Sequence, residues 1–224
     1  MGLVIVAPST EPPYSEHDIA NAYHEAGHVT VIIHEGFAFL PEPISIRDAD
    51  GGATTPWNPG DIVKRAREAQ TARARYDILK PKLLVDFAGG YAEVKKTGRG
   101  DAANDGIHDD MARSVKAFVE AVTPFSTEER KAWMAEADQS ARALVDSLWP
   151  AVIAIAEALL IQSKISGVEA RKLYDTALSS AFSIPPASTA PALPPQASIP
   201  PRRRGLWSWV LARLRSWVRG GTPP

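Results

Sequence analysis

The sequence predicts a compact, mainly α-helical domain with a small β element, followed by a proline-rich linker and a C-terminal amphipathic helix. Apolar residues recur at spacings of three and four in several segments before residue 183, which is typical of helices packed on a core. Nine of the 19 prolines follow Ile184, among few large apolar residues. We therefore divide the chain into an N-terminal segment (1–14), a helical domain (15–182), a linker (183–201) and a basic tail (202–224).

The first predicted helix follows Ser15 and ends at Gly36. Ser15 and Asp18 have the spacing of a capping box, which satisfies free N–H groups at a helix start. An apolar stripe follows at helical spacing: Ile19, Ala22, Tyr23, Ala26, Val29, Thr30 and Ile33. Gly27 lowers helix propensity by about 1 kcal/mol relative to Ala. We therefore expect another backbone, or a substrate, to approach this helix closely at Gly27.

Three elements are predicted in the next part of the chain. Residues 43–47 alternate as a short strand does, and the Asp-Gly-Gly sequence at 50–52 predicts a turn that starts a hairpin or a loop. Residues 61–78 are rich in Ala, Arg, Glu and Gln, which favours an exposed helix. Residues 83–91 continue with apolar residues at helical spacing, into the pair Gly89-Gly90.

Four more helices are predicted before the linker. Residues 111–122 carry an apolar stripe that follows acidic residues and stops at a Thr-Pro pair. Residues 126–148 begin with Ser-Thr-Glu-Glu, a helix start signal, and Pro150 suits the first turn of a helix through residue 161. Residues 167–177 predict a last short helix.

Composition restricts the chemistry and the compartment. The chain has no cysteine, so any metal ion must be held by His and carboxylate side chains. Residues 1–8 contain neither a basic region nor a long apolar segment, so they resemble neither a secretory signal nor a membrane span. We expect a cytoplasmic protein that can also lie at the inner face of a membrane.

Residues 24–28 read His-Glu-Ala-Gly-His, the HExxH signature of zinc hydrolases. Each residue of a helix advances by about 100°, so His24 and His28 lie one turn apart on one face and can reach one ion. Glu25 projects to the side, where it can take a proton from a water at the metal. HExxH also occurs by chance, but its place on a capped amphipathic helix favours a Zn²⁺ site with Glu25 as the catalytic base.

The third metal ligand must come from farther along the chain. His34 and Glu35 do not fit the spacing of the extended HExxH motifs. The loop at 98–110 is rich in glycine and acids and leads directly into an apolar-faced helix. A carboxylate in this loop would meet the ion from a helix N-terminus.

Several segments occur in the order found in the peptidase domain of FtsH-type zinc proteases, which the chain resembles over about residues 15 to 180. They are Ala22-Tyr23-His24-Glu25-Ala26-Gly27-His28, Pro43-Ile44-Ser45-Ile46, Ala88-Gly89-Gly90-Tyr91-Ala92-Glu93, the loop Gly100-Asp101-Ala102-Ala103-Asn104-Asp105, and the later runs 155–160 and 165–169. The resemblance implies a zinc peptidase whose third ligand is an aspartate at the end of the acidic loop.

Two aspartates are candidates for this ligand. The string Ala-Ala-Asn-Asp ending at Asp105 matches the family motif best, whereas helix register favours Asp110, because the buried side of the next predicted helix follows it. We slightly prefer Asp110; helix N-capping is the alternative role for either. Glu93 is a candidate for orienting a ligand histidine, or else is a surface acid.

FtsH proteins carry an ATPase module, but no G-x-x-x-x-G-K-[ST] motif occurs in this sequence. We therefore expect ATP-independent endopeptidase cleavage of peptides or unfolded polypeptide segments. An extended substrate is expected to pair with the edge of the strand at 44–46. The alternative is a noncatalytic, metal-stabilised binding or scaffold module, tethered to a membrane surface or a partner by its tail.

The tail predicts a basic amphipathic helix. Its apolar residues fall within one arc of about 140° on a helix, with arginines outside the arc. The apolar set is Leu206, Trp207, Val210, Leu211, Leu214, Trp217 and Val218, and the basic set is Arg213, Arg215 and Arg219. This pattern is typical of helices that bind an anionic membrane surface, and a protein groove is the next interpretation. No nucleic-acid partner is expected, because no nucleic-acid-binding fold accompanies the arginines.

Overall fold

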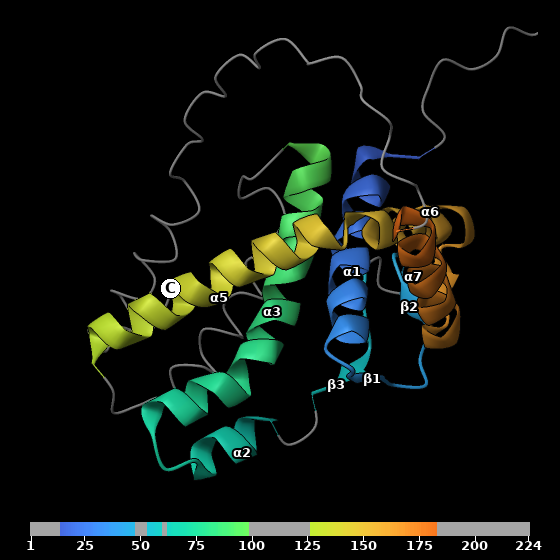
Figure 1. Cartoon of the computed structure of the whole chain (residues 1–224). Coiled ribbons are helices and arrows are strands. Elements are labelled where there is room, and N and C mark those ends of the chain that lie inside the picture. The colour runs from blue at the N-terminus through green and yellow to red at the C-terminus, as the bar shows by residue number, and fades with distance from the viewer. Residues whose placement is uncertain (1–13, 48–52, 60–61, 99–125, 183–224) are drawn as a thin grey trace, which may run out of the picture.

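The computed structural model describes residues 14–47, 53–59, 62–98 and 126–182, and this part of the chain is mainly helical, as predicted (Figure 1). Its helices are α1 (Glu16–His34), α2 (Ile62–Glu68), α3 (Ala72–Thr97), α5 (Thr127–Ser147), α6 (Trp149–Gln162) and α7 (Gly167–Phe182). Its strands are β1 (Ala38–Phe39), β2 (Ile44–Ser45), β3 (Trp57–Asn58) and β4 (Lys164–Ile165). The predicted helix at 111–122, the linker and the tail lie outside the described residues.

The predicted start of α1 is confirmed. Asp18 N donates to Ser15 Oγ at 3.1 Å, and Ser15 N donates to Asp18 Oδ2 at 3.2 Å, which completes the capping box. The helix ends at His34, and Gly36 adopts a left-handed φ of 74°, which glycine tolerates without strain.

The prediction of a single exposed helix at 61–78 is wrong. The chain breaks between α2 and α3, and Thr71 caps the second helix by accepting a hydrogen bond from Ala74 N at 3.2 Å. The Thr71 hydroxyl offers the backbone an alternative to continuing the first helix. α3 then passes through Pro81 and through the pair Gly89-Gly90 to Thr97.

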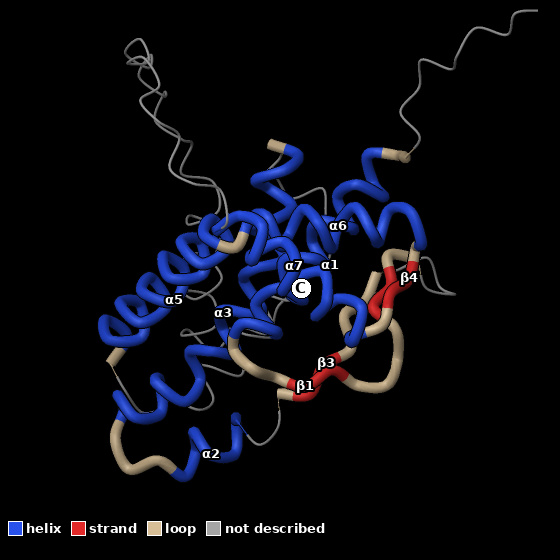
Figure 2. The backbone as a smooth tube through the Cα atoms, turned by 45° about the vertical axis from the view of Figure 1, so that its right-hand side comes forward, coloured by secondary structure: helices blue, strands red, loops and turns tan. Residues whose placement is uncertain are grey.

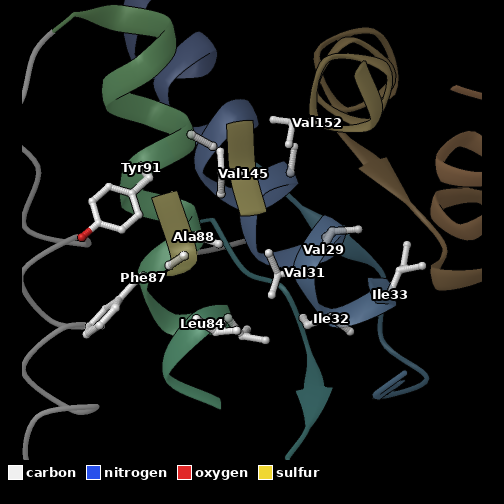
Figure 3. Close-up of a cluster of buried hydrophobic side chains, with 14 of the residues drawn as sticks. Val29, Val31, Ile32, Ile33, Leu84, Phe87, Ala88, Tyr91, Val145 and Val152 are labelled. Carbon is white, nitrogen blue, oxygen red and sulfur yellow. The ribbon is translucent and has the colours of Figure 1, made fainter. Parts of the chain in front are cut away.

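α1 is the central helix of the core. It packs most extensively on α3 and next on α6, and Figure 3 shows apolar side chains of α1 and α3 gathered with Val145 of α5 and Val152 of α6. A Cβ added at Gly27 would lie only 2.5 Å from the carbonyl oxygen of Ala88. The close backbone approach expected at Gly27 is therefore confirmed, and it is α3 that makes it.

Two small antiparallel sheets lie beside the helices (Figure 2). β1 pairs with β3, and β2 pairs with β4, which is far along the chain. On its other side β2 forms a bridge between Ser45 and Thr54, with N–H···O distances of 2.9 and 2.8 Å. The expectation that a substrate pairs with the edge at 44–46 is wrong, because the protein's own backbone occupies both edges.

The C-terminal helices follow their start signals. Ser126 caps α5 through a capping box with Glu129, and Pro150 lies in the first turn of α6, both as predicted. α7 continues to Phe182, five residues beyond the predicted end. Among the helices described here, none alone has the length and apolar character of a membrane span; α5 and α6 meet that test only together, across a bend of 74°.

Candidate metal centre

His24 and His28 bring two ring nitrogens together inside the protein. The histidines lie one turn apart on α1, and their Nε2 atoms are 3.0 Å from each other. The rings meet edge to face, with 4.7 Å between their centroids. Both residues are buried, with exposed fractions of 8% and 9%. The helical geometry of the HExxH motif is thus realised in a site with little access to solvent.

α3 fixes the orientation of both rings. Nδ1 of His28 lies 2.8 Å from the carbonyl oxygen of Val85, and Nδ1 of His24 lies 3.1 Å from Oε2 of Glu93. A carbonyl oxygen and a carboxylate can only accept, so each Nδ1 carries the hydrogen and donates it. Val85 and Glu93 are about two turns apart on α3, so a single helix orients both histidines.

These hydrogen bonds determine which lone pairs face each other. A neutral imidazole has one N–H and one lone pair, so donation through Nδ1 leaves the lone pair on Nε2. At 3.0 Å the two Nε2 atoms can share a proton in a hydrogen bond, and when both rings are neutral their lone pairs can instead share a metal cation. Two histidine nitrogens bound to one zinc ion at 2.0–2.1 Å in tetrahedral geometry are about 3.3 Å apart. The residues therefore fit a metal ion that takes imidazole ligands.

Glu25 is buried beside the histidine pair on α1, with an exposed fraction of 5%. Its Oε2 accepts a hydrogen bond from Thr55 Oγ1 at 2.5 Å. Thr55 lies between the Ser45–Thr54 bridge and β3, so a β segment as well as α3 contacts the motif helix. The carboxylate that follows the first histidine is therefore held by a partner outside α1.

The other predicted site residues lie outside the described residues. These are the candidate ligands Asp105 and Asp110, and the tail residues Trp207, Leu211, Arg213, Leu214, Arg215 and Trp217. Within residues 14–47, 53–59, 62–98 and 126–182, no three His, Asp or Glu side chains are grouped so that they could hold one ion. The third ligand stays a prediction.

Sequence reasoning missed three contributors to the site. A Cβ added at Gly89 would lie 2.5 Å from His28 Nε2, so glycine leaves the space that the ring occupies. Val85 contributes its backbone carbonyl, which no side-chain pattern reveals, and Thr55 reaches Glu25 from a segment with no motif. Only Gly89 left a signal, as a glycine inside a helical apolar pattern.

Comparison of the chain with models of known protein families and with curated proteins gave no match. The interpretation of the centre therefore depends on its own geometry and on the HExxH motif.

Proposed function

We propose that this chain is an ATP-independent, zinc-dependent endopeptidase that acts on peptides or unfolded polypeptide segments. One observation carries the proposal. The two buried Nε2 atoms of His24 and His28 lie 3.0 Å apart, with both Nδ1 atoms hydrogen-bonded to α3, beside the buried carboxylate of Glu25. This combination of two oriented imidazoles and an adjacent acid suits metal-assisted hydrolysis of an amide.

In this proposal each residue has a separate role. His24 and His28 hold the ion, and Asp110 or Asp105 is the third ligand. When bound, zinc would act as a Lewis acid that polarises the scissile carbonyl and makes water more acidic. Glu25 accepts the proton of the attacking water and passes it to the leaving amine.

The partners of the histidines support this assignment. Metal-binding histidines commonly donate their second ring N–H to a carboxylate or a backbone carbonyl, which orients the ring and makes the ligand more basic. Glu93 and the Val85 carbonyl are partners of these two types. Burial of the pair also keeps bulk water from competing for the ligand nitrogens.

The test compares the wild-type chain with Glu25→Gln for metal content and for hydrolysis of a fluorescence-quenched peptide and an unfolded protein. We expect zinc in both proteins, but a rate at least about 100-fold lower in the variant, because the general base is lost. Chelation should abolish the wild-type activity, and ATP should leave it unchanged. Glu35→Gln, the same substitution just beyond α1, is the matched control.

Two results would decide against the proposal. If Glu25→Gln retains full hydrolysis together with its zinc, Glu25 is not the base. If the wild-type chain binds zinc and cleaves neither substrate, the centre belongs to a noncatalytic, metal-stabilised module. Zinc content of Asp105→Asn and Asp110→Asn, measured in parallel, identifies the third ligand.

A further inference from the structure

Among the described residues, Thr55 donates a hydrogen bond to the carboxylate of Glu25. Its Oγ1 lies 2.5 Å from Glu25 Oε2 and 3.5 Å from the Glu25 carbonyl oxygen. A hydroxyl has one hydrogen to donate, and the shorter distance lies in the range of charge-assisted O–H···O⁻ bonds. The hydroxyl therefore donates to Oε2.

The backbone on both sides of Thr55 is fixed. Thr54 exchanges two hydrogen bonds with Ser45, at 2.9 and 2.8 Å, and Pro56 O accepts from Leu40 N at 3.1 Å. β3 continues the segment and pairs with β1. Because these anchors lie outside α1, the position of the Thr55 hydroxyl is set independently of the helix that carries Glu25.

We propose that Thr55 is a positioning residue that holds the Glu25 carboxylate in one orientation for proton transfer. Donation to Oε2 satisfies one carboxylate oxygen and leaves Oε1, which has no hydrogen bond to the described residues, as the oxygen that takes the proton of water. A carboxylate free to rotate would present this oxygen for only part of the time. The inference rests on the proposed function and adds to it the residue that orients the base.

The experiment compares three variants of the full chain. Thr55→Val keeps the shape but removes the hydroxyl, Thr55→Ser keeps the hydroxyl, and Thr54→Val makes the same substitution at the neighbouring residue, whose side chain has no hydrogen bond to the described residues. We expect Thr55→Val to lower kcat about 10- to 100-fold, with unchanged KM and unchanged zinc content, because only orientation of the base is lost. Thr55→Ser should recover kcat to within about threefold of wild type, and Thr54→Val should match wild type.

A second readout does not depend on activity. Thr55→Val, Glu25→Ala and the double variant form a cycle in which chemical unfolding midpoints of the full chain are measured. If the hydrogen bond forms in solution, the double variant loses less than the sum of the two single losses. Additive losses would show that the two side chains are not coupled, and would overturn the inference.

The outcomes separate the inference from the proposed function. Wild-type kcat in Thr55→Val, equal impairment of Thr55→Val and Thr55→Ser, or a loss of kcat that follows a loss of zinc would each overturn the positioning role. An inactive wild-type chain overturns the proposed function and with it the catalytic part of this inference. The unfolding cycle still tests the hydrogen bond in that case.

Discussion

At the scale of single residues, the candidate centre depends on how α3 holds two rings of α1. Glu93 is buried, with an exposed fraction of 5%, and accepts the N–H of His24 at 3.1 Å. Glu93→Gln removes the negative charge and keeps an oxygen acceptor, so it tests the effect of the charge on the ligand. We expect zinc affinity to fall about 10- to 100-fold, measured by competition with a chromophoric chelator.

Glu157→Gln is the control for Glu93→Gln, because Glu157 is an exposed acid on α6. Its affinity for zinc should equal that of the wild-type chain. Equal affinity in Glu93→Gln would instead mean that Glu93 does not act on the ligand, and its contact with His24 would be a structural one.

Gly89 provides a steric test of the same centre. An alanine Cβ would lie 2.5 Å from Nε2 and 2.7 Å from Cε1 of His28, so the ring must move. Helix propensity alone would favour alanine by about 1 kcal/mol. We expect the clash to outweigh this gain, so that Gly89→Ala purifies with less than half of the wild-type zinc.

The control for Gly89→Ala is the same substitution at Gly98, which ends α3 with a φ of 69°; among the described residues, apart from its own helix backbone and chain neighbours, no atom lies within 4 Å of an added Cβ. Gly98→Ala should lower the free energy of unfolding by about 1 kcal/mol through backbone strain and keep its zinc. Full zinc content in Gly89→Ala would show that the ring can shift without loss of binding.

The sequence identified the α1 residues of the centre better than the partners that other segments contribute. His24, Glu25 and His28 form a motif because their chemistry depends on side-chain type at a fixed spacing. The Val85 carbonyl is independent of side-chain type, and Thr55 meets Glu25 only after the β segments pair. Contacts that arise from chain folding between distant segments leave no local pattern.

At the scale of elements, predicted boundaries were accurate where a start signal is encoded locally. Ser15, Ser126 and Pro150 mark the starts of α1, α5 and α6 in sequence and structure alike. The break before Thr71 was missed because the Thr71 hydroxyl caps a new helix, and the continuation of α3 through Gly89 was missed because packing on α1 overrides local propensity. The pairing of β2 with β4 was missed because the two strands are far apart in sequence.

The capping box of α1 is also an electrostatic connection to the β segments. Arg47 donates to both carboxylate oxygens of Asp18, at 2.9 Å from Nε and 2.5 Å from Nη2. The hydrogen bonds from Arg47, and next those from Ser15, lower the pKa of Asp18 to about 2. Its pKa in the unfolded chain is near the ordinary value of 3.8, so folding favours the charged carboxylate.

This shift predicts how stability depends on pH. A carboxylate whose pKa is lower in the folded chain stabilises the fold at pH values above its unfolded-state pKa. This contribution is lost as pH falls from about 4 to about 2. Asp18→Asn should therefore reduce the free energy of unfolding at pH 7 by about 1 kcal/mol, a modest amount because the Arg47 side chain is 59% exposed. Chemical unfolding at pH 7 and at pH 2.5 measures it.

At pH 2.5 the difference between wild type and Asp18→Asn should be much smaller than at pH 7, because the carboxyl is then protonated in the unfolded chain while in the folded chain, with a pKa of about 2, it is still partly charged. An undiminished difference there would assign the effect to contacts of Asp18 that the asparagine variant does not reproduce, rather than to the charge of the carboxylate.

At the scale of the whole molecule, the core and the candidate centre share the crossing of α1 and α3. Gly27 allows the two backbones to approach, and the same approach brings Val85 and Glu93 of α3 within hydrogen-bond distance of the histidines. The apolar contacts of this crossing therefore also set the distances on which the proposed metal binding would depend. Substitutions that loosen it should lower zinc content before they unfold the chain.

The basic tail (202–224) lies outside the described residues, and the sequence predicts that it forms an amphipathic helix. On the predicted tail helix, tryptophans belong to an apolar arc and arginines lie outside it. This pattern predicts binding to an anionic bilayer, to which each arginine near the surface contributes about 1 kcal/mol. We expect the full chain to float with vesicles that contain phosphatidylserine, less so at high salt, and a chain truncated after Phe182 to stay in the soluble fraction. Arg213→Glu with Arg215→Glu should weaken flotation, because it reverses the attraction and keeps the apolar face. Equal flotation of the full and truncated chains would remove the membrane role of the tail and leave docking in a protein groove as the interpretation to test.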